Sequence, residues 1–61
     1  MKTISCIVPT YNEAPRIGNV IPVLTENPLI TEVIVVDDGS KDATREIVNE
    51  LALKYPKVRL V

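Results

Sequence analysis

The sequence predicts an α/β fold, a βαβαβ chain with a three-stranded parallel sheet. Three short apolar runs rich in β-branched residues, at 3–8, 33–36 and 58–61, have the composition of strands. Between them, two longer segments place apolar residues at helical spacing, and the connections are only a few residues long. Strands that alternate with helices pair in parallel through right-handed crossovers, so we expect a doubly wound α/β arrangement.

The first expected strand covers Thr3–Val8, and we expect Pro9 to close it because proline cannot donate a hydrogen bond to a sheet. A polar loop, residues 10–15, follows. The helix after it carries one apolar stripe at helical spacing, formed by Ile17, Val20, Ile21 and Leu24. Pro22 lies inside this helix and should kink it or restrict it to a segment that begins near Asn19.

The second expected strand is an unbroken run of four β-branched apolar residues, Val33–Val36. A strand without alternation of apolar and polar residues is typical of a sheet buried on both faces. Asp37 and Asp38 follow directly, so the strand is expected to end there. In open parallel sheets ligands bind beyond the carboxyl ends of the strands, which places this acidic pair where a ligand would bind.

The second helix is expected from about Lys41 to Tyr55, with Ser40 as its N-cap and Asp42 in its first turn. Its apolar stripe consists of Ile47, Val48, Leu51 and Tyr55. The third expected strand, 58–61, is short. Because sheets usually contain more than three strands, we expect residues 1–61 to be the N-terminal fragment of a longer domain.

Composition excludes several classes of function. The net charge is −1 and the basic residues are scattered, which argues against a nucleic-acid binder. The absence of histidine excludes His-based catalysis within the chain, and the single cysteine, Cys6, lies in an apolar run and is expected in the core. No apolar run approaches the roughly 20 residues of a membrane span. We therefore expect a location in the cytoplasm or on the cytosolic face of a membrane.

Two loops are expected side by side at the carboxyl edge of the sheet, at 9–13 and 37–40. Neither contains the glycine-rich fingerprint of dinucleotide-binding proteins or the P-loop. They supply an aromatic ring, carboxylates and hydroxyls, from Thr10, Tyr11, Glu13, Asp37, Asp38 and Ser40. An aromatic ring stacks on a base, and carboxylates accept hydrogen bonds from ribose and base but repel phosphate. This composition favours the nucleoside part of a nucleotide.

The same two segments carry a resemblance to a known family. Val8–Glu13, which reads VPTYNE, and Val33–Thr44, which reads VIVVDDGSKDAT, resemble the N-terminal signature of family 2 glycosyltransferases of the Rossmann-like GT-A fold. Members transfer a sugar from a nucleotide-diphosphate donor, commonly a UDP-sugar, to an acceptor, usually with inversion and with a divalent metal, Mg²⁺ or Mn²⁺. The resemblance covers nearly the whole chain.

The resemblance also implies residue roles. Pro9, Thr10 and Tyr11 would border the base and ribose, and Glu13 would approach the ribose. Asp37 would accept a hydrogen bond from the base. Asp38 would adjoin the nucleotide and shape the turn, and Asp-Gly-Ser is turn chemistry in its own right. The metal-binding Asp-x-Asp, the catalytic base and the acceptor site of the family lie later in the chain, so no catalytic or metal-binding residue is assigned and the fragment is expected to be inactive.

Two further expectations complete the sequence analysis. The family topology places the first strand inside the sheet, so in this fragment Thr3–Val8 would form an exposed apolar edge and invite self-association. An alternative function, of a different class, is a receiver-like signalling module that binds magnesium at Asp37 and Asp38. In receivers the acidic pair follows the first strand, whereas here it follows the second.

Overall fold

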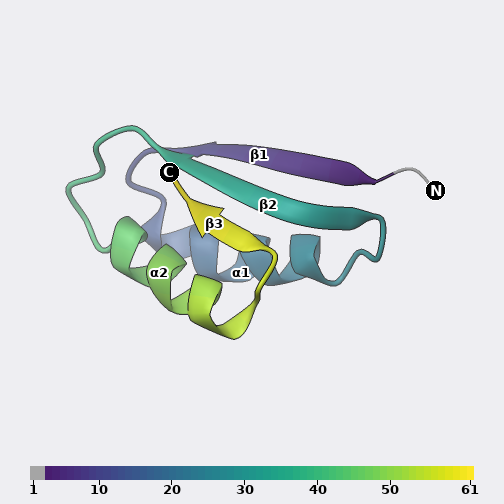
Figure 1. Cartoon of the computed structure of the whole chain (residues 1–61). Helices are drawn as coiled ribbons and strands as arrows, with labels where there is room; N and C mark the ends of the chain where they lie inside the picture. Colours follow the sequence, from purple (N-terminus) through teal and green to yellow (C-terminus); the bar gives the residue numbers. More distant parts are fainter. Residues whose placement is uncertain (1–2) are drawn as a thin grey trace.

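The computed structural model describes residues 3–61 and confirms the predicted α/β fold. The chain runs through β1 (Ile4–Thr10), α1 (Ala14–Thr25), β2 (Ile30–Asp37), α2 (Thr44–Lys54) and β3 (Val58–Leu60) (Figure 1). The strands form one sheet in the order β1-β2-β3, and both strand pairs are parallel. This arrangement is that of the N-terminal, Rossmann-like part of a GT-A domain.

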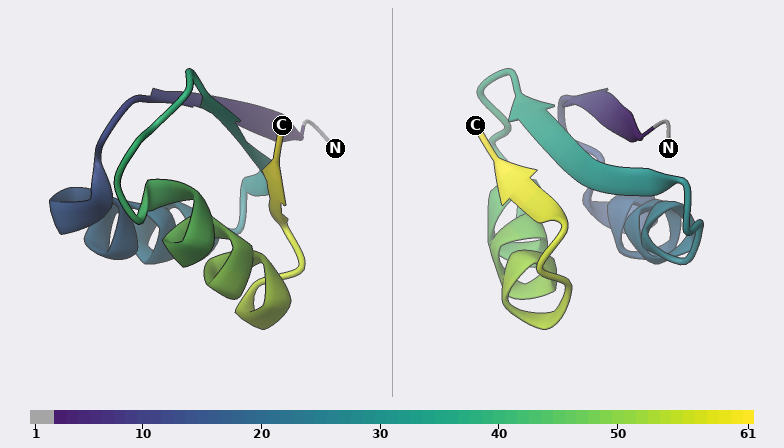
Figure 2. Two further views of the ribbon diagram at one scale, coloured as in Figure 1. Left: turned by 90° about the vertical axis from the view of Figure 1, so that its left-hand side faces the viewer. Right: turned by 45° about the vertical axis from the view of Figure 1, so that its right-hand side comes forward.

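Both helices lie against the same face of the sheet (Figures 1 and 2). Each crossover is right-handed, and each adds its strand in the same direction across the sheet, so the two helices must fall on one side. The core lies between them and the sheet, and it consists of Ile17, Ile21, Ile30, Val33, Val35, Val48 and Val58. We call this side of the sheet the covered face and the other side the open face.

The prediction that Val33–Val36 is buried on both faces is wrong for residues 3–61. Val33 and Val35 are fully buried on the covered face, but Val36 is 39% exposed. Ile7, which lies beside Ile34 on the open face, is 65% exposed. The apolar composition of β2 therefore exceeds what the two helices of this chain can cover.

Two local predictions about proline need correction: Pro9 does not close β1, and Pro22 does not restrict α1 to a segment that begins near Asn19. β1 continues through Pro9, which pairs with Val36, and ends at Thr10. The Thr10 carbonyl accepts the N–H of Asp38, so the backbone groups of Thr10 point towards β2. Backbone groups of successive residues point to opposite edges of a strand. The backbone nitrogen of Pro9 therefore points to the outer edge of the sheet, where no N–H is needed. α1 begins at Ala14 and contains Pro22 in its last turns. The carbonyl that Pro22 leaves unbonded belongs to Gly18, an exposed residue where water can reach it.

The remaining packing follows the predicted stripes. Ile17 and Ile21 of α1 are buried and Leu24 packs against the core, although Val20 is 43% exposed. The predicted stripe of α2, Ile47, Val48 and Leu51, packs in the core together with Tyr55 after the helix, and Cys6 packs there too. Within residues 3–61 no helix has the length and apolar character needed to cross a membrane.

Candidate functional site

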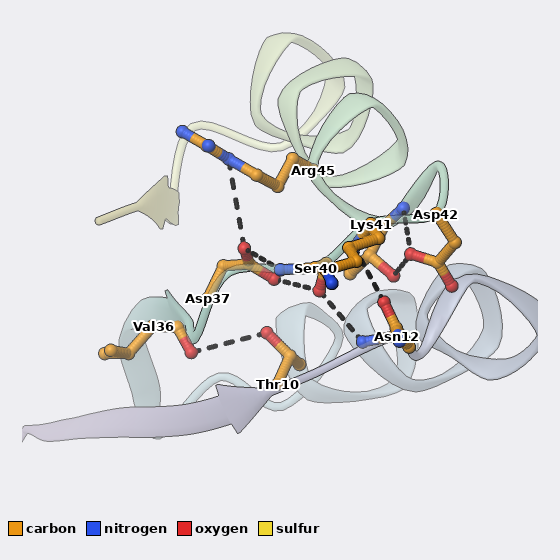
Figure 3. Close-up of polar contacts among 9 residues, drawn as sticks. Thr10, Asn12, Val36, Asp37, Ser40, Lys41, Asp42 and Arg45 are labelled. Carbon is orange, nitrogen blue, oxygen red and sulfur yellow. Dashed lines mark hydrogen bonds and ion pairs between the residues drawn. The ribbon is translucent and has the colours of Figure 1, made fainter.

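Two loops meet at the carboxyl edge of the sheet. The first loop, residues 11–13, joins β1 to α1, and the second loop, residues 38–43, joins β2 to α2. β1 and β2 are neighbours and run in parallel, so both loops leave the sheet at the same end (Figure 3). This end is the place where α/β sheets bind ligands.

Hydrogen bonds tie the two loops to each other. The Asp38 N–H donates to the Thr10 carbonyl at 2.9 Å, and the Asn12 N–H donates to Ser40 Oγ at 2.9 Å. In return, the Lys41 N–H donates to Asn12 Oδ1 at 2.8 Å. Asn12 takes up a left-handed backbone conformation, with φ 51°, which asparagine tolerates better than most residues. The loops therefore form one connected structure (Figure 3).

Asp37 organises the second loop from the covered face. Its side chain is only 3% exposed, and its carboxylate accepts the Ser40 N–H at 3.0 Å and the Ser40 hydroxyl. The Arg45 Nε lies 3.9 Å away (Figure 3). The hydrogen bond from the Ser40 hydroxyl, with smaller help from Arg45, lowers the pKa of Asp37 against the opposing effect of burial. Asp37 thus holds Ser40, whose Oγ receives the Asn12 N–H.

Asp38 differs from its neighbour, because successive side chains of a strand point to opposite faces. Asp38 is exposed, and no residue within 3–61 forms a hydrogen bond or ion pair with its side chain. Both carboxylate oxygens are therefore free to meet a ligand. The sequence favoured Asp37 as the base-recognising acid. In the structure the Asp37 carboxylate is bonded to Ser40, whereas the Asp38 carboxylate is unengaged within residues 3–61.

The other predicted site residues differ in accessibility. Tyr11 is 52% exposed, so its ring is available for stacking. Thr10 is 5% exposed, and its hydroxyl donates to the Val36 carbonyl at 3.4 Å. Glu13 accepts a hydrogen bond from Arg16 at 2.7 Å and is thereby engaged with the first turn of α1. Pro9 is exposed on the open face, beside Val36.

The predicted N-cap of the second helix is wrong. α2 begins at Thr44 rather than near Lys41, and Ser40 bonds to Asp37 and Asn12 instead of capping a helix. Ala43 occupies the N-cap position without a side-chain hydrogen bond. Asp42, one residue earlier, accepts the Thr44 N–H at 2.9 Å through its Oδ1 and also accepts the Thr44 hydroxyl. The hydrogen bond from the Thr44 hydroxyl is the main cause that lowers the pKa of Asp42.

Sequence reasoning missed Asn12 as part of the site. Asparagine, serine and aspartate are frequent turn and cap residues, so their presence could have predicted hydrogen bonds to residues nearby in the sequence. Their partners here lie 28 and 29 residues away, however, and nothing in the local sequence indicates them.

The donor set of this edge does not fit a metal ion. No group of three or more Cys, Asp or Glu side chains within residues 3–61 is placed to hold one. The oxygens of Asp37 and Asp42 receive hydrogen bonds from Ser40 and Thr44, which leaves Asp38 as the one unengaged carboxylate of the second loop. A single carboxylate is a poor site for a hard divalent cation, which takes about six oxygen ligands.

The fold and this edge define an α/β ligand-binding domain whose loops carry acids, hydroxyls and one exposed aromatic ring. Residues 5–61 match the model of Glycosyl transferase family 2. The chain belongs to this family. No solved structure matches the chain.

Several curated relatives are similar over most of the chain. It is 45% identical over 64 residues to a dolichyl-phosphate beta-glucosyltransferase of Trichomonas vaginalis, and the alignment covers 90% of this chain and 19% of the relative. It is 48% identical over 50 residues to a UDP-N-acetylglucosamine–dolichyl-phosphate N-acetylglucosaminyltransferase of Methanococcus voltae, over 82% of this chain and 20% of the relative. It is 39% identical over 59 residues to a bactoprenol glucosyl transferase of Shigella phage SfX, over 90% of this chain and 19% of the relative. The chain thus spans about a fifth of the length of these relatives.

Proposed function

We propose that this chain forms the nucleotide-binding part of a glycosyltransferase that takes its sugar from a nucleotide-diphosphate donor. The observation that carries the proposal is the pair of linked loops at the carboxyl edge, which present Tyr11 and Asp38 to solvent. Family membership supports a glycosyl transfer reaction. The printed name of the Methanococcus voltae relative includes a UDP-sugar, which supports UDP as the donor nucleotide.

The proposed roles follow from accessibility. The Tyr11 ring stacks on the base, since it is half exposed at the end of β1. The Asp38 carboxylate accepts hydrogen bonds from a base N–H or a ribose hydroxyl, because its oxygens have no other partner within residues 3–61. Asp37 supports the loop through Ser40. Glu13 reaches the ribose only if it releases Arg16.

The phosphates lie away from this acidic edge in the proposed complex. Asp37, Asp38 and Asp42 together repel a diphosphate, and their oxygens do not form a cation site. Magnesium or manganese would therefore be held by residues of the parent protein other than those described here, and so would the catalytic base. The 61-residue chain binds the nucleoside and has no transferase activity of its own in this proposal.

The acceptor in this proposal is a polyprenyl phosphate. Two of the similar relatives are named for dolichyl phosphate and one for bactoprenol. Such lipids are confined to membranes, so the parent protein would act at a membrane surface. The receiver-like alternative has no support, because the chain belongs to a glycosyltransferase family and the Asp37 carboxylate is already bonded to Ser40.

A nucleotide titration tests the proposal. In ¹⁵N-labelled 61-residue chain, we expect UDP to shift the backbone amide signals of residues 11–13 and 38–41 and to leave the turn at 27–29, at the other end of the sheet, unshifted. GDP in a parallel titration reports on base preference. Shifts that are absent with both nucleotides, or that fall outside the two loops, contradict the proposed site.

A further inference from the structure

One carboxylate serves the beginnings of both helices. Glu13 precedes α1 and Ala43 precedes α2, and neither supplies a capping side-chain hydrogen bond. Asp42 does so for both: its Oδ2 accepts the Ala14 N–H at 3.3 Å, and its Oδ1 accepts the Thr44 N–H at 2.9 Å. The first N–H groups of a helix lack partners within the helix, and a negative charge is favourable at this end.

The contact with Ala14 is not part of an ordinary helix cap. Asp42 and Ala14 are 28 residues apart: Asp42 lies in the second loop, and Ala14 is the first residue of α1. This bond completes a set of three cross-loop hydrogen bonds that involve side chains, together with Asn12 N–H to Ser40 Oγ and Lys41 N–H to Asn12 Oδ1. We call this set the loop clasp. Asp42 is the member that also anchors a helix on each side.

We propose that Asp42 is a positioning residue for the nucleotide site. By binding the first residue of each helix, it fixes the first loop, which carries Tyr11, against the second loop, which carries Asp38. That the ligand is a nucleotide rests on the proposed function above, whereas the coupling between the two loops does not. The coupling therefore has its own readout, which requires no nucleotide.

A single substitution separates this role from local capping. In Asp42→Asn, the side-chain oxygen can still accept from Thr44, and asparagine caps helices about as well as aspartate. The amide nitrogen then takes the place of Oδ2 and presents N–H groups to the Ala14 N–H, which leaves that donor without an acceptor. D42N thus keeps the cap of α2 and breaks the link to α1.

Asn27→Ala is the matched control. Asn27 Oδ1 accepts the Leu29 N–H at 2.9 Å, which is the same kind of side-chain to backbone bond in a turn at the opposite end of the sheet. N27A therefore removes one turn hydrogen bond without touching the loop clasp. Hydrogen exchange of backbone amides and UDP titration are measured on the unmodified chain, D42N and N27A.

In D42N we expect the amides of Asn12 and Ala14 to exchange several-fold faster, while Thr44 keeps its rate. UDP affinity should fall roughly fivefold, the change expected when one hydrogen bond is lost. In N27A the amides of both loops and the UDP affinity should stay at the values of the unmodified chain.

Three results would overturn the inference. Unchanged Ala14 exchange in D42N would make Asp42 a local cap of α2. Faster exchange with unchanged UDP affinity would show that the loops are coupled but that the coupling does not position the site. Equal losses of affinity in D42N and N27A would reduce the effect to general destabilisation. If the unmodified chain binds neither UDP nor GDP, the proposed function fails, and exchange at Ala14 alone decides whether Asp42 couples the loops.

Discussion

The two faces of the sheet differ in what covers them, and the two acids at the end of β2 differ in the same way. On the covered face Val33 and Val35 are fully buried and Asp37 has a side chain that is 3% exposed. On the open face Ile7 is 65% exposed and Val36 is 39% exposed. Asp38, two residues after Val36, is exposed too. The alternation of a strand thus gives two adjacent aspartates different chemistry, one that builds the loop and one that can meet a ligand.

The largest expected effect is on the free energy of unfolding, and two isoleucines, one on each face of the sheet, are compared to measure it. Ile21→Ala removes a fully buried side chain from the covered face and should lower the free energy of unfolding by about 2–5 kcal/mol. Ile7→Ala, on the open face, should change it by less than about 0.5 kcal/mol. Urea denaturation followed by circular dichroism measures both. Equal losses would mean that the open face is covered in solution.

The next effect concerns the two acids. Asp38→Asn should weaken UDP binding roughly tenfold, because a charged acceptor contributes more than a neutral one. Its unfolding midpoint should stay unchanged, since the Asp38 side chain has no partner within residues 3–61. Asp37→Asn should lower both the affinity and the midpoint, because Ser40 loses a charged acceptor.

Glu50→Gln is the control for both acid substitutions. It removes the same charge from an exposed position on α2 and should affect neither binding nor stability. If Asp37→Asn lowers affinity at unchanged stability while Asp38→Asn is neutral, the assignment of the two acids must be exchanged.

A third prediction concerns the outer edge of β1. Within residues 3–61 β1 pairs only with β2, and residues 3–8 contain no charged side chain. Such an edge can pair with a second copy of the chain, so we expect self-association that rises with concentration. Ile7→Lys should shift the population towards monomer in sedimentation velocity. Leu53→Lys, at a position on α2 that is 90% exposed, should leave the distribution unchanged. A monomer at high concentration in the unmodified chain would refute this prediction.

The smallest expected effect is on pH dependence. The pKa of Asp37 is lowered in the folded chain, chiefly by the Ser40 hydroxyl, so folding favours the ionised form. Its contribution to stability is present above the unfolded pKa of about 3.9 and is lost as the pH falls through the lower folded pKa. Asp37→Asn should therefore flatten the fall in stability below about pH 4. An acid denaturation curve with unchanged slope would show that Ser40 does not favour the charged form.

Much of the fold could be predicted because strand and helix periodicity are local. The apolar stripe at Ile17, Ile21 and Leu24 identified the inner side of α1, and the run from Val33 identified β2. The predicted end of β1 at Pro9 and the predicted restriction of α1 by Pro22 failed because the cost of a proline depends on which side of the strand or helix its missing N–H would face. That orientation follows from strand pairing and from solvent access, and neither is a property of the local sequence.

The candidate site was predictable in place but not in detail. The pairing of parallel strands brings residues 11–13 and 38–43 to one edge, and the motifs already indicated a nucleotide there. The start of α2 was misplaced because Ser40 and Asp42 are both good capping residues in isolation. In the folded chain the Ser40 hydroxyl donates to Asp37 and accepts from the Asn12 N–H, and Asp42 bonds the first residue of α2.

The amino-acid sequence alone was enough for the order of strands and helices, for the apolar side of each helix and for the family, because these depend on patterns a few residues long. The tertiary structure decided which acid faces solvent, which hydroxyl holds which loop, and that Asp42 joins the beginnings of two helices. The hydrogen bonds that join the two loops depend on residues 28 or 29 positions apart that meet only when β1 and β2 pair. Strand pairing fixes their register, and the chemistry of the edge follows from that register.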